Sequence, residues 1–284
     1  MLAIAVVFAA IAAALWRGNR ESVQFKPLVS SPQTLFDAIL PGPGQRTDLI
    51  LPDSALILWS GLTHRNLSLN DYASDHNPLL AVAPAANVPD SGLIGMLRTQ
   101  QLSRFADFRI VFAILQDYPQ YARHLSLHHA RSMHVRDFDS GDNFVLIGGY
   151  YSNPWASLFE KSANFHLQKT NDGSGCFVNK RPLPREQKIY CSARTFNAQG
   201  TDYAHITVVH NSDHGGRVLL IAGIHLEGTE AAGEFFLNPQ SVPEVLKSLH
   251  CDQIRHLPDY ELLLRIYSVG GTGRSAQLIS ARRL

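Results

Sequence analysis

The chain has 284 residues, of which 45% are hydrophobic and 17% are charged. This composition excludes an intrinsically disordered protein, and the length suffices for one large domain or two small lobes. Lysines and arginines number 25 against 24 aspartates and glutamates, so the formal net charge is only +1. So small a net charge gives no reason to expect a direct contact with nucleic acid.

An uncharged apolar run occupies residues 2–15 and ends at an aromatic residue that is followed by Arg17 and Arg20. An apolar segment with such a border predicts that residues 2–16 contact a membrane. We interpret residues 1–17 as a membrane anchor or a secretory signal segment, with a buried core helix as the remaining alternative. The two arginines, taken alone, favour a cytoplasmic position for the rest of the chain.

Polar, aperiodic residues 18–30 predict a linker between this segment and a body at residues 31–284. We expect the body to be an α/β ligand-binding domain, with residues 31–140 and 141–284 as candidate lobes. Helical patterns dominate its first half. The elements expected there are a short helix capped by Ser31, a strand at 48–51, helices at 55–62 and 69–74, and two helices between 91 and 115 that separate near Ser103.

Two near-continuous apolar runs in the second half, Asn143–Ile147 and Arg217–Ala222, predict parallel strands that are buried on both faces. Shorter alternating segments between them predict an antiparallel extension or a sheet edge. The expected fold class is therefore α/β, with a mainly parallel central sheet, flanking helices and an antiparallel extension. The shorter strands are expected at 163–170, 175–179, 188–192 and 202–210, and a hairpin at 260–282 is expected to turn at Gly270–Gly273.

Each buried strand is followed by glycine and the start of a helix. In an open parallel sheet this order forms a crevice beyond the strand ends, where glycine admits a ligand and helix N–H groups face it. Asn153 and Thr229 are expected to cap the two helices, and well-capped turns without a ligand are the alternative. Glu227 and Glu230 would repel an anion, so a neutral or cationic ligand is expected. The candidate ligand-binding residues are Gly148, Gly149, Ser152, Asn153, Gly223, Glu227, Gly228, Thr229 and Glu230.

The same crevice supports a rival hypothesis, a hydrolase that acts on a small neutral substrate. Ser152 would be the nucleophile and His225 the base, oriented by Glu227 or Glu230. The chain contains no G-x-S-x-G motif, so whether it is an enzyme stays open. A purely structural surface module without a pocket is a third alternative.

No metal and no cofactor are expected. A histidine cluster has members at helical spacing, but its segment is at least as typical of a strand. An acidic segment resembles a calcium loop with misplaced ligands and is interpreted as a turn. These two groups are His124, His128, His129 and His134, and Asp137, Asp139 and Asp142.

The three cysteines leave the redox state of the chain open. Cys176 and Cys191 flank an expected hairpin, so a disulfide between them is conceivable in an oxidising compartment, with Cys251 left over. Three reduced, buried thiols are the favoured alternative.

The chain resembles an uncharacterised bacterial protein group over residues 30–240. The resemblance is carried by the blocks NFVLIGGYYSNPWASLFEKSANFHL, CFVNKRPLPREQKIY, DYAHITVVHN and RVLLIAGIHLEGTEAAGEFF, which contain the motifs GGxxSNPW and AGxxxEGTEAAGEF. Members of the group place this region behind a winged-helix DNA-binding domain and one transmembrane helix. Within the present 284 residues no DNA-binding domain is expected, and the first motif departs from the group by carrying Tyr150-Tyr151.

This resemblance implies a membrane-tethered sensory or ligand-binding domain, the extracytoplasmic part of a transcriptional regulator. It would place the body in the periplasm, against the indication from Arg17 and Arg20. The expected partner is a small molecule or another protein, and the oligomeric state stays open.

Overall fold

The computed structural model describes residues 33–63, 65–74, 91–170, 175–195, 199–211 and 215–284. The expected anchor, the linker and the cap at Ser31 lie outside these residues. Among the residues described, no helix combines the length and the apolar composition that a membrane crossing requires. Residues 33–284 form one compact unit.

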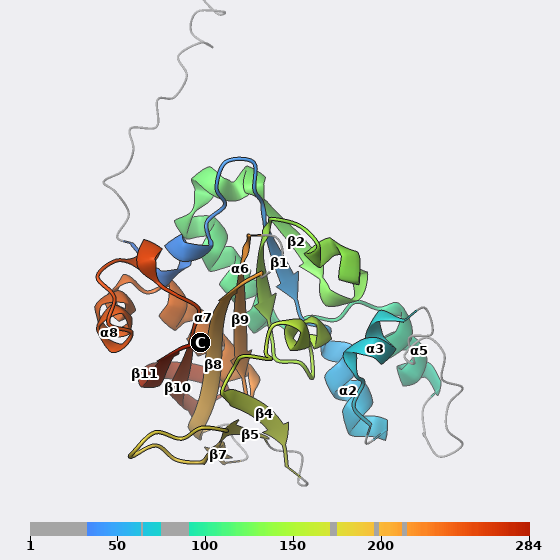
Figure 1. Ribbon diagram of the computed structural model, residues 1–284. Coiled ribbons are helices and arrows are strands. Elements are labelled where there is room, and N and C mark those ends of the chain that lie inside the picture. Colours follow the sequence, from blue (N-terminus) through green and yellow to red (C-terminus); the bar gives the residue numbers. More distant parts are fainter. Residues whose placement is uncertain (1–32, 64, 75–90, 171–174, 196–198, 212–214) are drawn as a thin grey trace, which may run out of the picture. The chain divides into compact units, whose positions relative to one another are not determined.

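The main sheet has eight strands within the described part of the chain (Figure 1). Its first four strands in spatial order are mutually parallel, and the remaining neighbours are antiparallel. In that order the strands are β2 (Leu125–His129), β1 (Thr47–Leu51), β3 (Asn143–Ile147), β9 (Arg217–Gly223), β8 (Gly200–His210), β10 (Tyr260–Val269) and β11 (Thr272–Arg283), and β7 (Ala193–Arg194) pairs with β8.

This topology confirms the expected α/β class with parallel strands in the core. The expected antiparallel extension is present too, since β8, β10 and β11 continue the sheet with antiparallel pairing beyond β9, and β8 lies inside the sheet and not at an edge. The two candidate lobes, residues 31–140 and 141–284, contribute neighbouring strands to the same sheet, since β1 pairs with β3. The expected hairpin is confirmed in β10 and β11, which pair antiparallel around Gly270-Gly271.

A second sheet is separate from the main one. It contains β4 (Phe165–Lys169), β5 (Gly175–Asn179) and β6 (Ile189–Cys191), all antiparallel. Cys176 and Cys191 are direct partners in the β5–β6 register and form a disulfide. The favoured expectation of three reduced thiols was therefore wrong, because cross-strand pairing brings these two side chains together, and only Cys251 is free.

Helices cover both faces of the main sheet. The two helices expected between residues 91 and 115 are present and separate at Ser103. The α-helices are α2 (Ser54–Thr63), α3 (Leu69–Ala73), α5 (Ser91–Thr99), α6 (Phe105–Asp117), α7 (Leu226–Leu237) and α8 (Val242–Ser248). Short 3₁₀ helices are η1 (Leu35–Ile39), η2 (Pro119–His124), η3 (Ala130–Ser132), η4 (Val135–Phe138), η5 (Pro154–Leu158), η6 (Pro239–Ser241) and η7 (Ile254–His256).

Burial on both faces explains the apolar runs in the strands. On β3, Val145 and Ile147 belong to a core that includes residues of α6, α7 and α8, whereas Phe144 and Leu146 belong to a second core with residues of α2 and η5. Successive side chains of a strand point to opposite faces, so a strand between two cores must be apolar at every position. The small sheet has its own cluster, which includes Leu263 of β10.

A buried polar cluster joins the small sheet to the main one. The carboxylate of Glu261 on β10 accepts hydrogen bonds from the backbone N–H groups of Asn164 and Phe165 and lies 3.0 Å from Nε2 of His205. Burial alone would raise the pKa of Glu261, but these hydrogen bonds and the imidazole hold it below its ordinary value. The cluster therefore fastens the start of β4 to β8 and β10.

Candidate ligand-binding pocket

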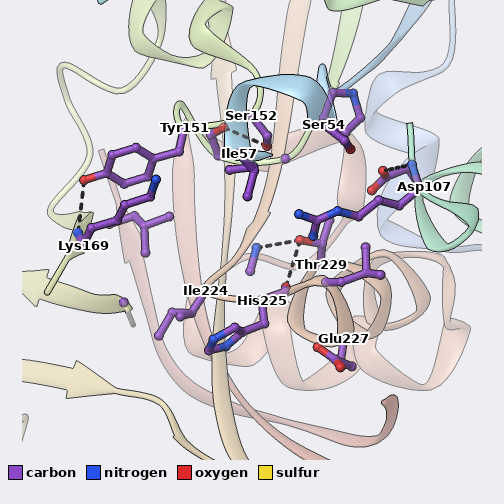
Figure 2. Close-up of a pocket in the computed structure, with 18 of the residues that line it drawn as sticks. Ser54, Ile57, Asp107, Tyr151, Ser152, Lys169, Ile224, His225, Glu227 and Thr229 are labelled. Atoms are coloured by element: carbon purple, nitrogen blue, oxygen red, sulfur yellow. Dashed lines mark hydrogen bonds between the residues drawn. The ribbon is translucent and has the colours of Figure 1, made fainter. Parts of the chain in front are cut away.

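A cavity of about 330 Å³ lies beyond the carboxyl ends of β1, β3 and β9. This volume is in the range of small-molecule sites. Its walls come from the turn after β1 and the start of α2, the start of α6, the turn after β3, the small sheet with β7, and the start of α7. Figure 2 shows lining residues from each of these segments, among them Ser54, Asp107, Ser152, Lys169 and His225.

The order of the strands accounts for this position. After β1 the chain goes to β2 on one side, whereas after β3 it goes on, by way of β4 to β8, to β9 on the other side. Connections that leave in opposite directions cannot cover the strand ends between them, and a crevice remains there. The crevice expected from the sequence is thus present as a cavity.

Two glycines shape the turns that border the pocket. Gly148 has a φ of +87°, and a Cβ added there would lie 2.5 Å from Oγ of Ser152. A Cβ on Gly223 would lie 2.3 Å from the backbone nitrogen of Thr229. Both positions therefore require glycine, the first for its backbone conformation and both for the close approach of the following turn.

Six of the nine candidate ligand-binding residues line the pocket, and His225 lines it as well. The six are Gly148, Gly149, Ser152, Gly223, Glu227 and Thr229.

The other three, Asn153, Gly228 and Glu230, are not among the lining residues. Asn153 is fully buried, and its Nδ2 donates to the carbonyls of Ile147 at 3.1 Å and Ile50 at 3.4 Å, so it ties the ends of β3 and β1 together. Gly228 packs against β8, and Glu230 forms an ion pair with Arg109.

The expected helix caps need correction. Helix α7 begins at Leu226, with His225 at the N-cap position, so Thr229 lies inside the first turn. Its Oγ1 accepts the backbone N–H of Gly223 at 3.0 Å and thereby closes the turn after β9. Asn153 is at the N-cap position of η5, with proline next to it, but its side chain makes no capping hydrogen bond because it is engaged with the strand ends.

Arginines accompany both glutamates that were expected to repel an anion. Glu227 lies 2.6 Å from the guanidinium of Arg194, and Glu230 pairs with Arg109. A neutral or cationic ligand was expected because the two carboxylates were taken to be unpaired. Since both are paired with arginines, they no longer exclude an anionic ligand. The sequence separations, 33 and 121 residues, left no local signal of these pairs.

Besides Arg194, two cationic side chains on the pocket wall were missed from the sequence. Nζ of Lys169 donates to Oγ of Ser60 at 3.0 Å and lies 4.4 Å from the ring centroid of Tyr151, and burial lowers its pKa. Arg104 precedes α6, and its guanidinium has no hydrogen-bond or ion-pair partner among the described residues. Neither residue belongs to a recognisable motif, so only the fold reveals them.

Asp107 is the second carboxylate on the wall. Its Oδ2 accepts the backbone N–H of Arg104 at 3.0 Å, which caps the start of α6. Burial raises the pKa of Asp107 to about 6, although the N–H and the charge of Arg104 act in the opposite direction.

The proposed hydrolytic triad is not assembled. Oγ of Ser152 donates to the carbonyl of Gly149 at 3.3 Å, and Figure 2 shows Ser152 and His225 on different walls. Nδ1 of His225 lies 3.2 Å from Oδ1 of Asp202, which is fully buried. The carboxylate beside the histidine therefore comes from β8, and the two glutamates nearer in sequence are paired with arginines.

Among the described residues, no group of three or more histidine, cysteine, aspartate or glutamate side chains is arranged to hold a metal ion. Comparison of the chain with known proteins found no matching family model, curated protein or solved structure.

Proposed function

We propose that the chain is a membrane-tethered sensory domain, which binds a small molecule in the pocket beyond β1, β3 and β9. The observation that carries this proposal is a cavity of about 330 Å³ at the point where the strand connections diverge. Its walls combine apolar side chains, such as Ile57, Leu167 and Ile224, with polar groups from several elements. This mixture is typical of sites for small organic molecules.

A buried hydroxyl supports binding. Ser54 is only 7% exposed and lines the pocket, and its Oγ has no hydrogen-bond partner in the described part of the chain. Leaving a buried hydroxyl unpaired costs about 1–3 kcal/mol, and a ligand with a polar group would recover that cost.

The apolar run at residues 2–15 supports the tether, as does the resemblance in the two motifs. The disulfide between Cys176 and Cys191 supports an extracytoplasmic position, because such bonds persist in oxidising compartments. By the same resemblance, the domain would serve as the sensory part of a transcriptional regulator.

Helices α6 and α7 offer a route for the response. Both begin at the pocket and pack closely, since a Cβ on Gly233 of α7 would lie 2.7 Å from Ile110 of α6. A ligand that contacts both helix starts with different affinity in two arrangements of the pair would shift the population between them.

The proposal is tested by thermal unfolding of the full chain in detergent against a panel of metabolites. At least one compound is expected to raise the Tm of the wild type. Ile57 lines the pocket, so Ile57→Trp should fill it and remove the effect, whereas Leu58→Trp changes the neighbouring residue, which is 48% exposed and outside the pocket. Equal responses in these two variants would contradict the proposed site.

A second candidate is an enzyme that uses His225, because Asp202 orients its ring as a general base would require. Turnover of a stabilising compound by the wild type, lost in His225→Gln, would favour this candidate. Stabilisation without turnover favours the sensory domain.

A further inference from the structure

We infer that the molecule bound in this pocket carries an oxyanion group, a phosphate or a carboxylate, which Arg104, Lys169 and Ser54 receive. The inference rests on the proposed function and names the ligand class of the same site. Three side chains on the pocket wall are left able to donate a hydrogen bond to an oxygen of the ligand.

Within the described residues the guanidinium of Arg104 forms no ion pair or side-chain hydrogen bond, although its charge acts on the carboxylate of Asp107. Its backbone N–H, not its side chain, bonds to Asp107. A guanidinium offers planar N–H donors that match two oxygens of a phosphate or carboxylate. An unpaired arginine on the wall of a cavity is therefore a suitable receptor for such a group.

Lys169 adds a second positive charge. The partners recorded for its Nζ are neutral, the side-chain oxygens of Ser60 and Asn66, so its charge is not cancelled by an ion pair within the described residues. These two hydrogen bonds and the ring of Tyr151 hold the lysine in place beside the cavity. A held ammonium loses little conformational entropy when an anion binds.

The hydroxyl of Ser54 supports an oxyanion site independently of the two positive charges. Its Oγ is buried on the pocket wall and finds no hydrogen-bond partner among the described residues, and a hydroxyl can donate to an oxyanion. The start of α7 also reaches the pocket, and His225 at its N-cap makes no side-chain capping bond. The first N–H groups of that helix lack partners within the helix and carry its positive dipole end.

Negative charge on the same wall is limited. Glu227 and Asp107 are the two carboxylates that line the pocket. Glu227 is neutralised by Arg194, and Asp107 is engaged with the backbone N–H at the start of α6. With Arg194 and Glu227 cancelled, the positive charges of Arg104 and Lys169 exceed the single carboxylate of Asp107, so the site is positive on balance.

The test uses the full chain in detergent with inorganic phosphate against chloride at equal ionic strength. Phosphate at ten times its Kd should raise the Tm by about 3 °C. Arg104→Gln should weaken phosphate binding about tenfold or more, and Arg104→Lys should retain part of it. Lys169→Gln should also weaken binding, while Arg136→Gln, on exposed η4 outside the pocket, should leave it unchanged.

The same Tm measurement with matched pairs of a neutral and a charged compound separates this inference from the proposed function. The pairs are adenosine with adenosine monophosphate, ribose with ribose 5-phosphate, and propanol with propionate. Stabilisation by the charged members alone, dependent on Arg104, supports the inference, and the phosphates and the carboxylate distinguish its two sources. If the neutral members stabilise the chain and Ile57→Trp removes the effect, the proposed binding pocket stands, but the inference that its ligand carries an oxyanion is overturned. Stabilisation by phosphate that is equal in the wild type and Arg104→Gln would also overturn it, and so would the absence of any effect of inorganic phosphate, the phosphate esters and propionate.

Discussion

Single residues determine the shape of the pocket, and Gly223 is the tightest of them. The turn after β9 brings the nitrogen of Thr229 to a point where no Cβ fits. We predict that Gly223→Ala lowers the free energy of unfolding by about 3 kcal/mol, since the turn must open to accept the methyl group. Denaturant unfolding measures this loss.

Gly61→Ala is the matched control, because Gly61 lies in helix α2 and a Cβ there would meet nothing within 4 Å. Alanine is the better helix former, so this variant should be unchanged or more stable by up to about 1 kcal/mol. Equal losses in the two variants would contradict the close approach at Gly223.

Asp107 makes stability depend on pH. Its native pKa of about 6 lies above the ordinary 3.8, so the native state holds the proton more tightly than the unfolded chain does. The resulting stabilisation is complete below about pH 4 and is lost as the pH rises through 6. Asp107→Asn should therefore be more stable than the wild type at pH 7.5, by about 2 kcal/mol, and equal to it at pH 4.

The measurement is the free energy of unfolding across that pH range. Asp117→Asn, exposed at the other end of α6, is the control and should follow the wild type. A difference between Asp107→Asn and the wild type that does not change with pH would contradict the assignment.

At the scale of elements, one ion pair positions α2 beside the pocket. The guanidinium of Arg131 donates to both carboxylate oxygens of Asp53, at 2.8 and 2.9 Å, and to the carbonyl of Arg98. Asp53 is fully buried and also accepts the N–H of Ala55 at the start of α2. The pair therefore links the segment after β2 with α5 and α2.

Arg131→Met should lower the free energy of unfolding by about 3–5 kcal/mol, because it leaves the Asp53 carboxylate buried without its counter-charge. Adding Asp53→Asn removes that charge and should restore part of the loss. Additive losses in a double-mutant cycle would show that the two side chains act independently, against this account.

The strand and helix patterns that the sequence predicted correctly are local ones. Val145 and Leu219 lie in parallel strands that pair directly, as their apolar runs indicated, and the glycines that follow both strands border one cavity. Periodicity and glycine placement contain this information because they report burial and backbone conformation within a few residues.

The side chains that line the pocket and their bonding partners could not be predicted in the same way. His225 finds its carboxylate on β8. Lys169 reaches the wall from a second sheet, whose strands were expected but whose separation from the main sheet no local pattern indicated. Thr229 and Asn153 were assigned to caps because their residue types favour them, yet both bond to nearby strand ends or turns. Side chains of these types can bond to nearby backbone groups in several ways, so the residue type alone does not decide which bond forms.

At the scale of the whole molecule, the disulfide between Cys176 and Cys191 stabilises the small sheet that forms one wall of the pocket. It closes a loop of 15 residues, for which the loss of the bond costs about 3 kcal/mol. The double variant Cys176→Ala/Cys191→Ala should therefore unfold at a Tm lower by about 8 °C.

A reducing agent should lower the Tm of the wild type similarly and leave the double variant unaffected, and Cys251→Ser should respond to it like the wild type. No effect of the reducing agent on any of them would show that the bond is absent from the folded chain.

The central claim is that the cavity beyond β1, β3 and β9 holds a small molecule. A crystal structure of the chain with the compound that most raises its Tm tests this most directly. We expect that compound between Ser54, Ser152 and Thr229, with an oxyanion on Arg104 or Lys169. The compound bound elsewhere, with the cavity holding only water, would contradict the account.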